Sequence, residues 1–462
     1  MIVLFEIDEL LKKVKRIHFI GIGGSGMCPL AEILHKEGYE LSGSDNNETD
    51  TLARVRSLGI PVTLGQKAEN IEGAELIVYT AAILPDNPEL VAAKNSSIPT
   101  VERADLLGAI TRLYSDCYCV CGTHGKTTVS SMLTQIMIQC GKDPSAVIGG
   151  ELPLIHSHGR VGNTQNMVCE SCEFKDHFLK LDPDIAIILN VDADHLEYFK
   201  NIENIIKSFH TFAEMANKAV IYNGDDANTL KAIDGVGGKD MITFGIGKSN
   251  DYYADNIEMV NAFAHFDAYK KGKKIGSVKL KVPGRHNVSN ALAALAAADY
   301  CGIPFSEAIA SLEQFGGACR RFEILAKLNG ITFADDYAHH PAELRVTLEA
   351  AMQMKYRKVW AVFQPFTYSR TKKLMDDFAE VLQIPDECVM TEIMGSREVN
   401  TEGVYTSQLA AKIPGSVWFN TFDEVADYVL GHAQSGDLVI TLGCGDIYKA
   451  AKLMIKRLEE NK

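Results

Sequence analysis

Residues 118–128 read YCVCGTHGKTT, an apolar stretch that runs into a turn with two glycines. Residues 127–140 continue with a helical pattern, so the turn lies between a predicted strand and a predicted helix. Backbone amides in such a turn can surround phosphates, the lysine can pair with the β and γ groups, and the first threonine hydroxyl can bind Mg²⁺. The spacing G-x-x-G-K-T is two residues shorter than the common phosphate loop, so the prediction depends on this context. We predict a triphosphate-binding loop formed by Gly122, Thr123, His124, Gly125, Lys126, Thr127 and Thr128.

The same order of apolar strand, turn and helix recurs along most of the chain. This alternation is typical of an α/β fold with parallel sheets. Residues 250–282 differ, because Tyr, Phe, Val and Lys alternate there without a helical period, and they predict a small antiparallel β patch. The expected strands are 16–22, 75–79, 118–121, 167–169, 185–190, 219–223, 331–334, 358–363, 388–391 and 437–442, and the expected helices include 27–36, 127–140 and 288–300.

Restarts of this pattern divide the chain into three predicted domains. One sheet rarely needs two phosphate-binding turns, so a boundary is expected between residues 105 and 115. The alternation of strand and helix restarts from about residue 321, which indicates a third, doubly wound domain. We assign the domains to residues 1–108, 109–318 and 319–462.

An earlier turn, Gly21-Ile22-Gly23-Gly24-Ser25-Gly26, also lies between a predicted strand and a predicted helix. Its glycines let backbone amides approach a pyrophosphate, and Asp45, nineteen residues after Gly26, can accept a hydrogen bond from a ribose hydroxyl. The pattern therefore predicts a nucleotide diphosphate ligand. It does not identify NAD, because a UDP-sugar presents the same groups, and a tight turn without a ligand is the structural alternative.

Acidic residues and a histidine follow two further strands of the middle domain. Glu170 and Glu173 come after residues 167–169, and residues 190–195 read NVDADH after the apolar stretch 184–189. Ligands of open α/β sheets bind at the carboxyl ends of strands, where these groups and the glycine turn converge. Carboxylate oxygens and an imidazole beside phosphate oxygens suit Mg²⁺ or Mn²⁺. For each residue taken singly, helix capping or a surface position is the alternative.

The composition of the 462 residues argues against several classes of protein. Asp and Glu outnumber Lys and Arg by 60 to 46, and the formal net charge of −14 argues against nucleic-acid or anionic-membrane binding. The longest apolar stretches are far shorter than the ~20 residues of a membrane span, and the N-terminus has no signal-peptide pattern. We expect a soluble cytoplasmic protein that acts on small molecules, without membrane insertion.

The eleven cysteines are expected to be reduced thiols. Cys117, Cys119 and Cys121 alternate along a predicted strand, and Cys169 and Cys172 form a C-x-x-C. A zinc or iron–sulfur site with standard spacing would need a second close pair, which the sequence lacks. We therefore predict that the alternating cysteines line one buried face of the strand.

Six motifs, taken in order, are similar to those of one family. They are HFIGIGGSGM (18–27), GTHGKTT (122–128), DADH (192–195), GRHNVSNA (284–291), RRFE (320–323) and DDYAHHP (335–341). In these motifs the chain resembles the Mur ligases, and the resemblance runs from about residue 17 to GDLVITLGCGDIY at 436–448. It implies a UDP-binding Rossmann-like domain, a central ATPase domain and a C-terminal Rossmann-like domain that binds an amino acid.

The resemblance also implies an activity, that of the family branch that adds L-alanine in peptidoglycan precursor synthesis. There the carboxylate of UDP-N-acetylmuramate takes the γ-phosphoryl group of ATP, the amino group of L-alanine attacks the acyl phosphate, and ADP and phosphate leave. Mg²⁺ or Mn²⁺ and Lys126 would offset the charge on the transferred group. We expect the chain to act as a monomer or a weak homodimer.

Positions that match the family's motifs carry the implied roles. The implied catalytic residues are Lys126, Glu173, His195 and Arg321, and the implied metal ligands are Thr127 and Glu173 on one ion and Glu173 and His195 on the other. The implied ATP ligands are the loop 122–128, His286, Asn287, Asn290, Arg321 and Asp336. The implied UDP-sugar ligands are Gly21, Gly23, Gly24, Ser25, Gly26, Asp45 and Thr80, and the implied amino-acid ligands are Tyr337, His339 and Arg370.

Two positions depart from the family pattern. Phe366, in QPFTYSRT (364–371), replaces the usual histidine, which puts the amino-acid selectivity in doubt. Several Mur ligases carry a carbamylated lysine where this chain has Phe209. Lys207 is nearby but out of register, so no carbamylation is assigned, and the alanine-adding branch is similar in lacking it.

Three other functions are alternatives. A nicotinamide-linked oxidoreductase would use only the turn at 21–26 and Asp45, and would leave the second loop unexplained. A non-catalytic UDP-sugar sensor would not need Lys126, Glu173 and His195. The recycling ligase that attaches a whole peptide to the same sugar usually carries Cys and Phe in its first turn, where this chain reads GIGGSG.

Overall fold

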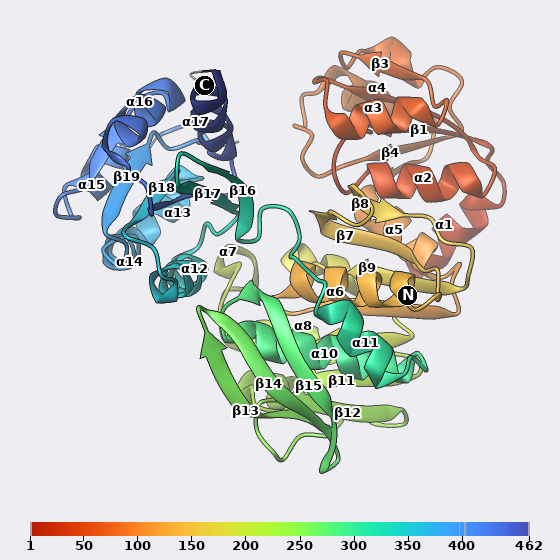
Figure 1. Ribbon diagram of the computed structural model, residues 1–462. Coiled ribbons are helices and arrows are strands. Elements are labelled where there is room, and N and C mark those ends of the chain that lie inside the picture. The colour runs from red at the N-terminus through yellow and green to blue at the C-terminus, as the bar shows by residue number, and fades with distance from the viewer. Residues whose placement is uncertain (1, 397, 402, 461–462) are drawn as a thin grey trace. The chain divides into compact units, whose positions relative to one another are not determined.

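The computed structural model describes residues 2–396, 398–401 and 403–460, which form three β-sheets with their helices (Figure 1). By their internal contacts these residues make two compact units. The first unit holds the chain up to residue 257 with 266–279 and 288–315, and the second holds 258–265, 280–287 and the chain from residue 316. The predicted α/β class is confirmed, and the three domain boundaries stay predictions.

The first sheet is parallel throughout, with the strand order β3-β2-β1-β4-β5. Strand β1 ends two residues earlier than predicted, because Gly21 has a φ of +82° and begins the glycine turn. The elements are α1 (Ile2–Leu11), β1 (Arg16–Ile20), α2 (Cys28–Lys36), β2 (Glu40–Asp45), α3 (Asp50–Ser57), β3 (Val62–Leu64), η1 (Ala68–Ile71), β4 (Leu76–Tyr79), α4 (Pro88–Asn95), β5 (Thr100–Glu102) and α5 (Arg103–Thr111).

The second sheet has ten strands in the order β15-β14-β13-β12-β11-β10-β6-β9-β7-β8. Its first elements are β6 (Asp116–Cys121), α6 (Lys126–Gln139), β7 (Ser145–Leu152), β8 (Ser157–Arg160), β9 (Asn166–Glu170), η2 (Phe174–Lys180), β10 (Ile185–Ile188), α7 (Leu196–Phe199) and α8 (Ile202–Met215). The others are β11 (Ala219–Asn223), α9 (Ala227–Ala232), β12 (Asp240–Gly245), β13 (Tyr252–Val260), β14 (Phe263–Lys270), β15 (Lys273–Pro283), α10 (His286–Tyr300) and α11 (Phe305–Leu312).

Strand direction in this sheet changes where the sequence pattern changes. The neighbouring pairs from β13 to β7 are parallel. Strands β13, β14 and β15 follow one another through two-residue connections at 261–262 and 271–272, which only antiparallel neighbours allow. The predicted antiparallel patch is therefore confirmed.

The third sheet has the order β16-β17-β21-β18-β19-β20, with β16 antiparallel to β17 and the other pairs parallel. Helix residues Leu344 and Phe378 pack in the core on one face, and Val425 and Met454 in the core on the other, as a doubly wound sheet requires. The strands are β16 (Glu323–Leu328), β17 (Ile331–Asp336), β18 (Val359–Phe363), β19 (Glu387–Thr391), β20 (Val417–Phe419) and β21 (Leu438–Leu442). The helices are α12 (Pro341–Gln353), α13 (Tyr368–Lys373), α14 (Met375–Val381), α15 (Thr406–Ala410), α16 (Phe422–His432) and α17 (Tyr448–Glu460).

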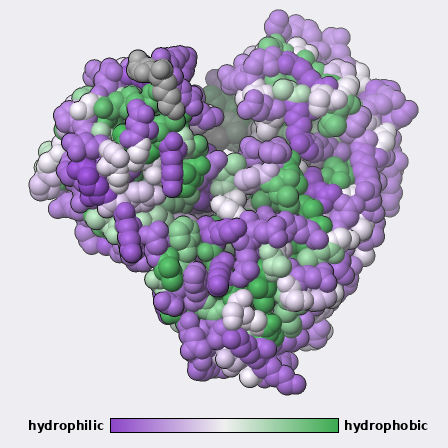
Figure 2. All heavy atoms as spheres, viewed as in Figure 1, coloured by the Kyte–Doolittle hydropathy of each residue, from purple (hydrophilic) through white to green (hydrophobic). Residues whose placement is uncertain are grey.

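The prediction omitted several strands at the sheet edges. Strands β3, β5 and β20 have only three residues each, and β8 reads SHGR, so neither length nor hydrophobicity marked them. Hydrophilic residues are spread over the face shown in Figure 2, with apolar residues between them. None of the described helices is long and apolar enough to cross a membrane.

A buried polar network supports the first glycine turn. Glu89, in the first turn of α4, accepts hydrogen bonds from His18 Nε2 on β1 and from the Ser44 hydroxyl on β2, each over 2.6 Å. The carbonyl of Ser44 accepts from the amides of Gly21 and Ile22 over 2.8 and 3.0 Å. The network therefore ties the end of β2 to the start of the turn.

The row of cysteines lies inside the second sheet. Cys117, Cys119 and Cys121 on β6 have no exposed surface, which confirms the predicted burial, and Cys169 on β9 is equally buried. Cys119 is the register partner of Cys169, and the sulfurs of Cys117 and Cys119 are 3.6 Å apart. Burial raises the pKa of both Cys119 and Cys121, so these thiols stay protonated at neutral pH.

Strand β17 ends in a buried carboxylate, Asp336. It accepts hydrogen bonds from the amides of Phe322 and Ala338 over 2.8 and 2.7 Å. Burial raises the pKa of Asp336 to about 6, although the charge of Arg321 and the two amides act in the opposite direction. This carboxyl group therefore holds its proton more tightly in the folded chain than in the unfolded chain.

We predict that the titration of Asp336 makes the second unit less stable as the pH rises from about 4 to 6. The variant Asp336→Asn should remove this part of the pH dependence. The folded pKa lies above the unfolded value of ~3.9, so the folded state binds more protons in this interval and the stabilisation is lost as the pH passes 6. The difference of about two between the folded and unfolded pKa values corresponds to roughly 3 kcal/mol of unfolding free energy. Urea unfolding followed by tryptophan fluorescence measures it, because Trp360 and Trp418, the only two tryptophans, lie in this unit. Equal pH slopes for wild type and variant would contradict the assignment.

Candidate active site

The phosphate loop, residues 122–128, connects the end of β6 to the start of α6. Gly125 precedes the helix with a φ of +87°, and a Cβ there would lie 2.7 Å from Asn290 Oδ1. Gly122 has a φ of +144°, and its Cβ would lie 2.9 Å from the Cβ of Leu189. Both positions therefore require glycine. Asn290, a predicted ATP ligand, lies directly against the loop.

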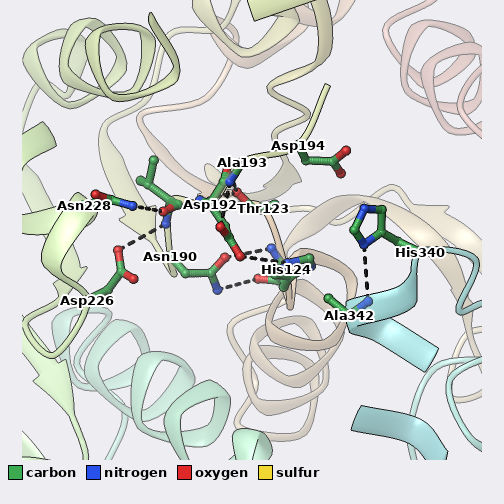
Figure 3. Close-up of polar contacts among 12 residues, drawn as sticks. Thr123, His124, Asn190, Asp192, Ala193, Asp194, Asp226, Asn228, His340 and Ala342 are labelled. Atoms are coloured by element: carbon green, nitrogen blue, oxygen red, sulfur yellow. Dashed lines mark hydrogen bonds and ion pairs between the residues drawn. The ribbon is translucent and has the colours of Figure 1, made fainter. Parts of the chain in front are cut away.

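The segment after β10 holds the phosphate loop in place (Figure 3). The Asn190 side chain accepts a hydrogen bond from the His124 amide over 2.8 Å and donates one to the His124 carbonyl over 3.0 Å. The Asp192 amide donates to the Thr123 hydroxyl over 2.9 Å. Asn190 was not in the predicted ATP set. Its position immediately after an apolar strand was the only sequence signal for this role.

Lys126 lies within the loop rather than pointing freely into solvent. Its ammonium group contacts both carboxylate oxygens of Glu173, at 3.0 and 2.9 Å, and donates to the carbonyls of Gly122 and Thr123 over 2.6 and 3.1 Å. Burial is the largest single influence on the pKa of Lys126 and acts to lower it. The charge and hydrogen bond of Glu173, together with the charges of Cys172 and Glu170, outweigh burial and raise the pKa. The lysine therefore stays protonated, with Glu173 as its partner.

Thr127 contacts a different carboxylate from the one assigned to it. Its hydroxyl donates to Glu170 Oε1 over 2.9 Å, and the other oxygen of Glu170 accepts from the Gly149 amide over 2.7 Å. The predicted metal pair joined Thr127 to Glu173, whereas Glu173 contacts Lys126. Glu170, the last residue of β9, is outside the predicted metal set, and the structure places it at the loop.

His195 is the N-cap residue that precedes α7, and it has the left-handed conformation with a φ of +52°. Its amide donates to Asp194 Oδ1 over 2.7 Å, and its ring lies 4.8 Å from the ring of Phe174, centroid to centroid. Phe174 directly follows Glu173. The two predicted metal ligands Glu173 and His195 are thus carried by segments that touch each other.

The donor set at this edge of the sheet fits a magnesium ion bound together with ATP. Within the described parts of the chain, no three acidic, histidine or cysteine side chains are grouped closely enough to hold a metal by themselves. Mg²⁺ usually keeps several waters and takes one or two protein carboxylates plus substrate phosphates. The buried carboxylate of Glu173 and the Glu170–Thr127 pair beside a phosphate loop match that requirement.

The first glycine turn gathers most of the predicted UDP-sugar residues. The Gly23 amide donates to Asp45 Oδ2 over 3.0 Å, so Asp45 lies against the turn. A Cβ on Gly21 would lie 3.5 Å from Thr80 Cγ2. A Cβ on Gly26 would lie 3.4 Å from the Arg103 side chain, which brings a cation that was not predicted to the end of the turn. Gly24 and Ser25 complete the turn, and Ser25 is exposed.

The predicted amino-acid residues gather in the second unit at the ends of β17 and β18. The rings of Tyr337 and His339 are 5.5 Å apart, and those of His339 and Phe366 are 6.4 Å apart. Burial lowers the pKa of His339, and the charge of Arg370 lowers it further. The guanidinium carbon of Arg321 lies 5.4 Å from the centre of the Tyr337 ring. These residues form one cluster around His339.

The remaining predicted ATP residues lie at the start of α10 and at the end of β17. His286 and Asn287 begin α10, and the Asn287 side chain donates to the Pro283 carbonyl over 2.7 Å. Asp336 has the buried position described above. Their contacts with ATP stay predictions.

Three domain families match this chain in succession. The family described as "Mur ligase family, catalytic domain" matches residues 16–115, "Mur ligase middle domain" matches 120–298, and "Mur ligase, glutamate ligase domain" matches 320–445. Together these ranges cover most of the chain.

Individual relatives agree with these matches. A curated UDP-N-acetylmuramate–L-alanine ligase from Caldanaerobacter subterraneus subsp. tengcongensis is 43% identical over 99% of this chain and 100% of its own. The crystal structure of a UDP-N-acetylmuramate-alanine ligase from Thermotoga maritima has a TM-score of 0.83 at 29% identity, covering 97% of this chain and 100% of its own. A murein peptide ligase from Psychrobacter arcticus shares the fold, with a TM-score of 0.75 at 24% identity over 96% and 98% of the two chains.

These families match the chain in succession between residues 16 and 445. This stretch contains the phosphate loop, the carboxylates that contact it and the three sheets. The chain belongs to the Mur ligase family.

Proposed function

We propose that this chain is an ATP-dependent ligase that joins L-alanine to the carboxylate of UDP-N-acetylmuramate. The observation that carries the proposal is the phosphate loop, in which Lys126 and Thr127 each contact a carboxylate, at Glu173 and Glu170. The full-length relative at 43% identity bears the name of this activity. The proposal includes a cytoplasmic location and small-molecule partners only.

The reaction begins when the sugar carboxylate attacks the γ-phosphorus of ATP, which forms an acyl phosphate and releases ADP. The neutral amino group of L-alanine then attacks the acyl carbon. The amide bond forms as the nitrogen releases a proton to solvent, and phosphate leaves with the electron pair of the broken carbon–oxygen bond. Lys126 neutralises charge on the transferred phosphoryl group. A bound Mg²⁺ supplies further charge neutralisation, and Thr127, Glu170, Glu173 and His195 are the residues that would hold it.

The recycling ligase of the same family is the nearest alternative. The solved murein peptide ligase from Psychrobacter arcticus is less similar to this chain than the solved alanine ligase from Thermotoga maritima, with a TM-score of 0.75 against 0.83. A nicotinamide-linked oxidoreductase leaves the contacts of Lys126 and Thr127 without a purpose. The proposed ligase accounts for both glycine turns.

Phosphate release tests the proposed function. The purified full chain is given ATP, Mg²⁺ and UDP-N-acetylmuramate, with L-alanine, glycine, L-serine or the complete stem peptide as the acceptor. We expect release that requires both the sugar and the acceptor, with L-alanine preferred. Release that occurs only when the stem peptide is the acceptor would support the recycling ligase. Binding of NADH without binding of ATP would support the oxidoreductase.

The same panel tests the effect of Phe366 on selectivity. Its ring lies 6.4 Å from that of His339, so an apolar face replaces a polar group in the predicted amino-acid cluster. An apolar wall tolerates a small apolar side chain such as that of alanine. It offers no hydrogen bond to the hydroxyl of serine, so serine should gain nothing from this position.

We predict that Lys126→Ala reduces ligation at least tenfold, which corresponds to ~1.4 kcal/mol of lost transition-state stabilisation. The reason is that the ammonium group is held at the phosphate loop, where charge develops during transfer. Phosphate release is the measurement, with thermal unfolding in parallel because the variant leaves Glu173 without its ion pair. Lys207→Ala, which changes an exposed lysine on α8, is the matched control. Retention of more than a tenth of the activity would overturn the role of Lys126.

We predict that Asp45→Ala raises the KM for UDP-N-acetylmuramate about tenfold or more and leaves the KM for ATP nearly unchanged. Asp45, at the end of β2, lies against the first glycine turn, whereas Lys126 lies on the second loop, after β6. A hydrogen bond to a charged carboxylate is worth about 1.5–3 kcal/mol, which sets the expected size. Initial rates with each substrate varied in turn give both constants, and Asp86→Ala, at an exposed aspartate of the same domain, is the control. An equal rise for ATP would contradict the assignment of two separate nucleotide sites.

A further inference from the structure

Asp176 and Tyr198 link the two segments that carry Glu173 and His195. The Tyr198 hydroxyl donates a hydrogen bond to Asp176 Oδ2 over 2.6 Å. The Asp176 amide donates to the Glu173 carbonyl, and the Tyr198 amide donates to the His195 carbonyl, each over 2.9 Å. Three hydrogen bonds in series therefore join the backbone at Glu173 to the backbone at His195.

The carboxylate of Asp176 is fixed from a third element as well. Its other oxygen accepts a hydrogen bond from the Ser208 hydroxyl on α8, a mostly buried residue. Helix α8 packs against η2. The buried rings of Phe209 and Phe212 on α8 lie 5.1 and 4.7 Å from the ring of Phe178 in η2. Asp176 thus has both oxygens occupied by hydroxyl groups, one on α7 and one on a rigidly packed helix.

The backbone around this link is in unusual conformations. Lys175, Asp176 and His195 have φ values of +54°, +59° and +52°, in the left-handed region that residues other than glycine seldom adopt. Such conformations persist only where the surrounding contacts determine them, and they are concentrated at functional sites. The contact between the rings of Phe174 and His195 adds a second connection between the same two segments.

We propose that Asp176 and Tyr198 are positioning residues that set the separation and orientation of Glu173 and His195 for a divalent metal ion. The inference rests on the proposed function, in which these two residues hold the metal with ATP. Neither Asp176 nor Tyr198 is assigned to a substrate or to the metal itself. Residues in this outer position orient the ligands, and their substitution costs about 10- to 100-fold in metal affinity or activity.

The test measures the binding of Mn²⁺ to the full chain without turnover. The electron paramagnetic resonance signal of the free ion is the readout. Binding is measured with the β,γ-methylene analogue of ATP present. We expect Tyr198→Phe and Asp176→Asn to raise the dissociation constant of Mn²⁺ about tenfold. The KM for UDP-N-acetylmuramate should not change, because that substrate is assigned to the first glycine turn. Asp176→Ala, which removes both acceptor oxygens, should have a larger effect than Asp176→Asn.

Tyr300→Phe is the matched control. Tyr300 donates to Asp240 over 3.3 Å, so this variant removes a tyrosine–aspartate hydrogen bond in the same unit that involves neither segment. The dissociation constant of Mn²⁺ from the Tyr300→Phe variant should equal that from the wild type. Tyr198 is partly exposed, so Tyr198→Phe removes one oxygen with little effect on folding even if the Asp176 variants unfold.

The outcomes separate this inference from the proposed function. Mn²⁺ binding by Tyr198→Phe and Asp176→Asn within twofold of the wild type would overturn the inference, even if the wild type is an active ligase. Weaker binding by both variants would support it, even if the wild type releases no phosphate and the proposed ligase activity fails. A wild-type chain that binds no Mn²⁺ with the analogue would overturn both.

Discussion

The parallel pairing of β9, β6 and β10 is the constraint on which the candidate site depends. Val120 is opposite Glu170 in one pair, and Cys121 is opposite Ile188 in the other, so the three strands end at nearly the same level. The phosphate loop, the segment with Glu173 and the segment with Asn190 all leave the sheet at this level. A slip of one residue would turn each side chain to the opposite face, and strands with both faces buried do not tolerate it.

The ion pair between Lys126 and Glu173 means that the loop already has a partner for its cation. Removing one member of a buried pair leaves an uncompensated charge, which costs about 3–5 kcal/mol. In the proposed reaction the phosphates of ATP would become the partner of Lys126, and a bound metal ion would become the partner of Glu173. Each charge exchanges one partner for another, so the loop accepts a highly charged ligand without leaving a buried charge alone in either state.

Much of the fold was predictable because strand and helix periods are strong and glycines mark the turns. The strand 219–223 is observed at the predicted residues, and α6 begins one residue from its predicted start. Short edge strands such as β8 were missed because four polar or small residues carry no period-two pattern.

The sequence indicated candidate residues for the site but not the contacts between them. Glu170 ends β9 and Glu173 lies three residues later, just before η2, so the sequence could not show which carboxylate contacts Thr127 and which contacts Lys126. The link from Asp176 to Tyr198 spans 22 residues and depends on left-handed backbone, which no periodicity reveals. Motif order supplied the candidate residues, and tertiary packing decided their partners.

The buried thiols of β6 and β9 provide a natural probe for opening of the second sheet. A thiol reagent reacts with an accessible thiolate, and Cys117, Cys119, Cys121 and Cys169 are neither accessible nor readily ionised in the folded chain. Their alkylation therefore requires the strands beneath the phosphate loop to separate, and its rate reports how often that opening occurs. A nucleotide that holds the loop closed would slow the alkylation, so the chain carries its own label for ligand binding at a place where no dye needs to be attached.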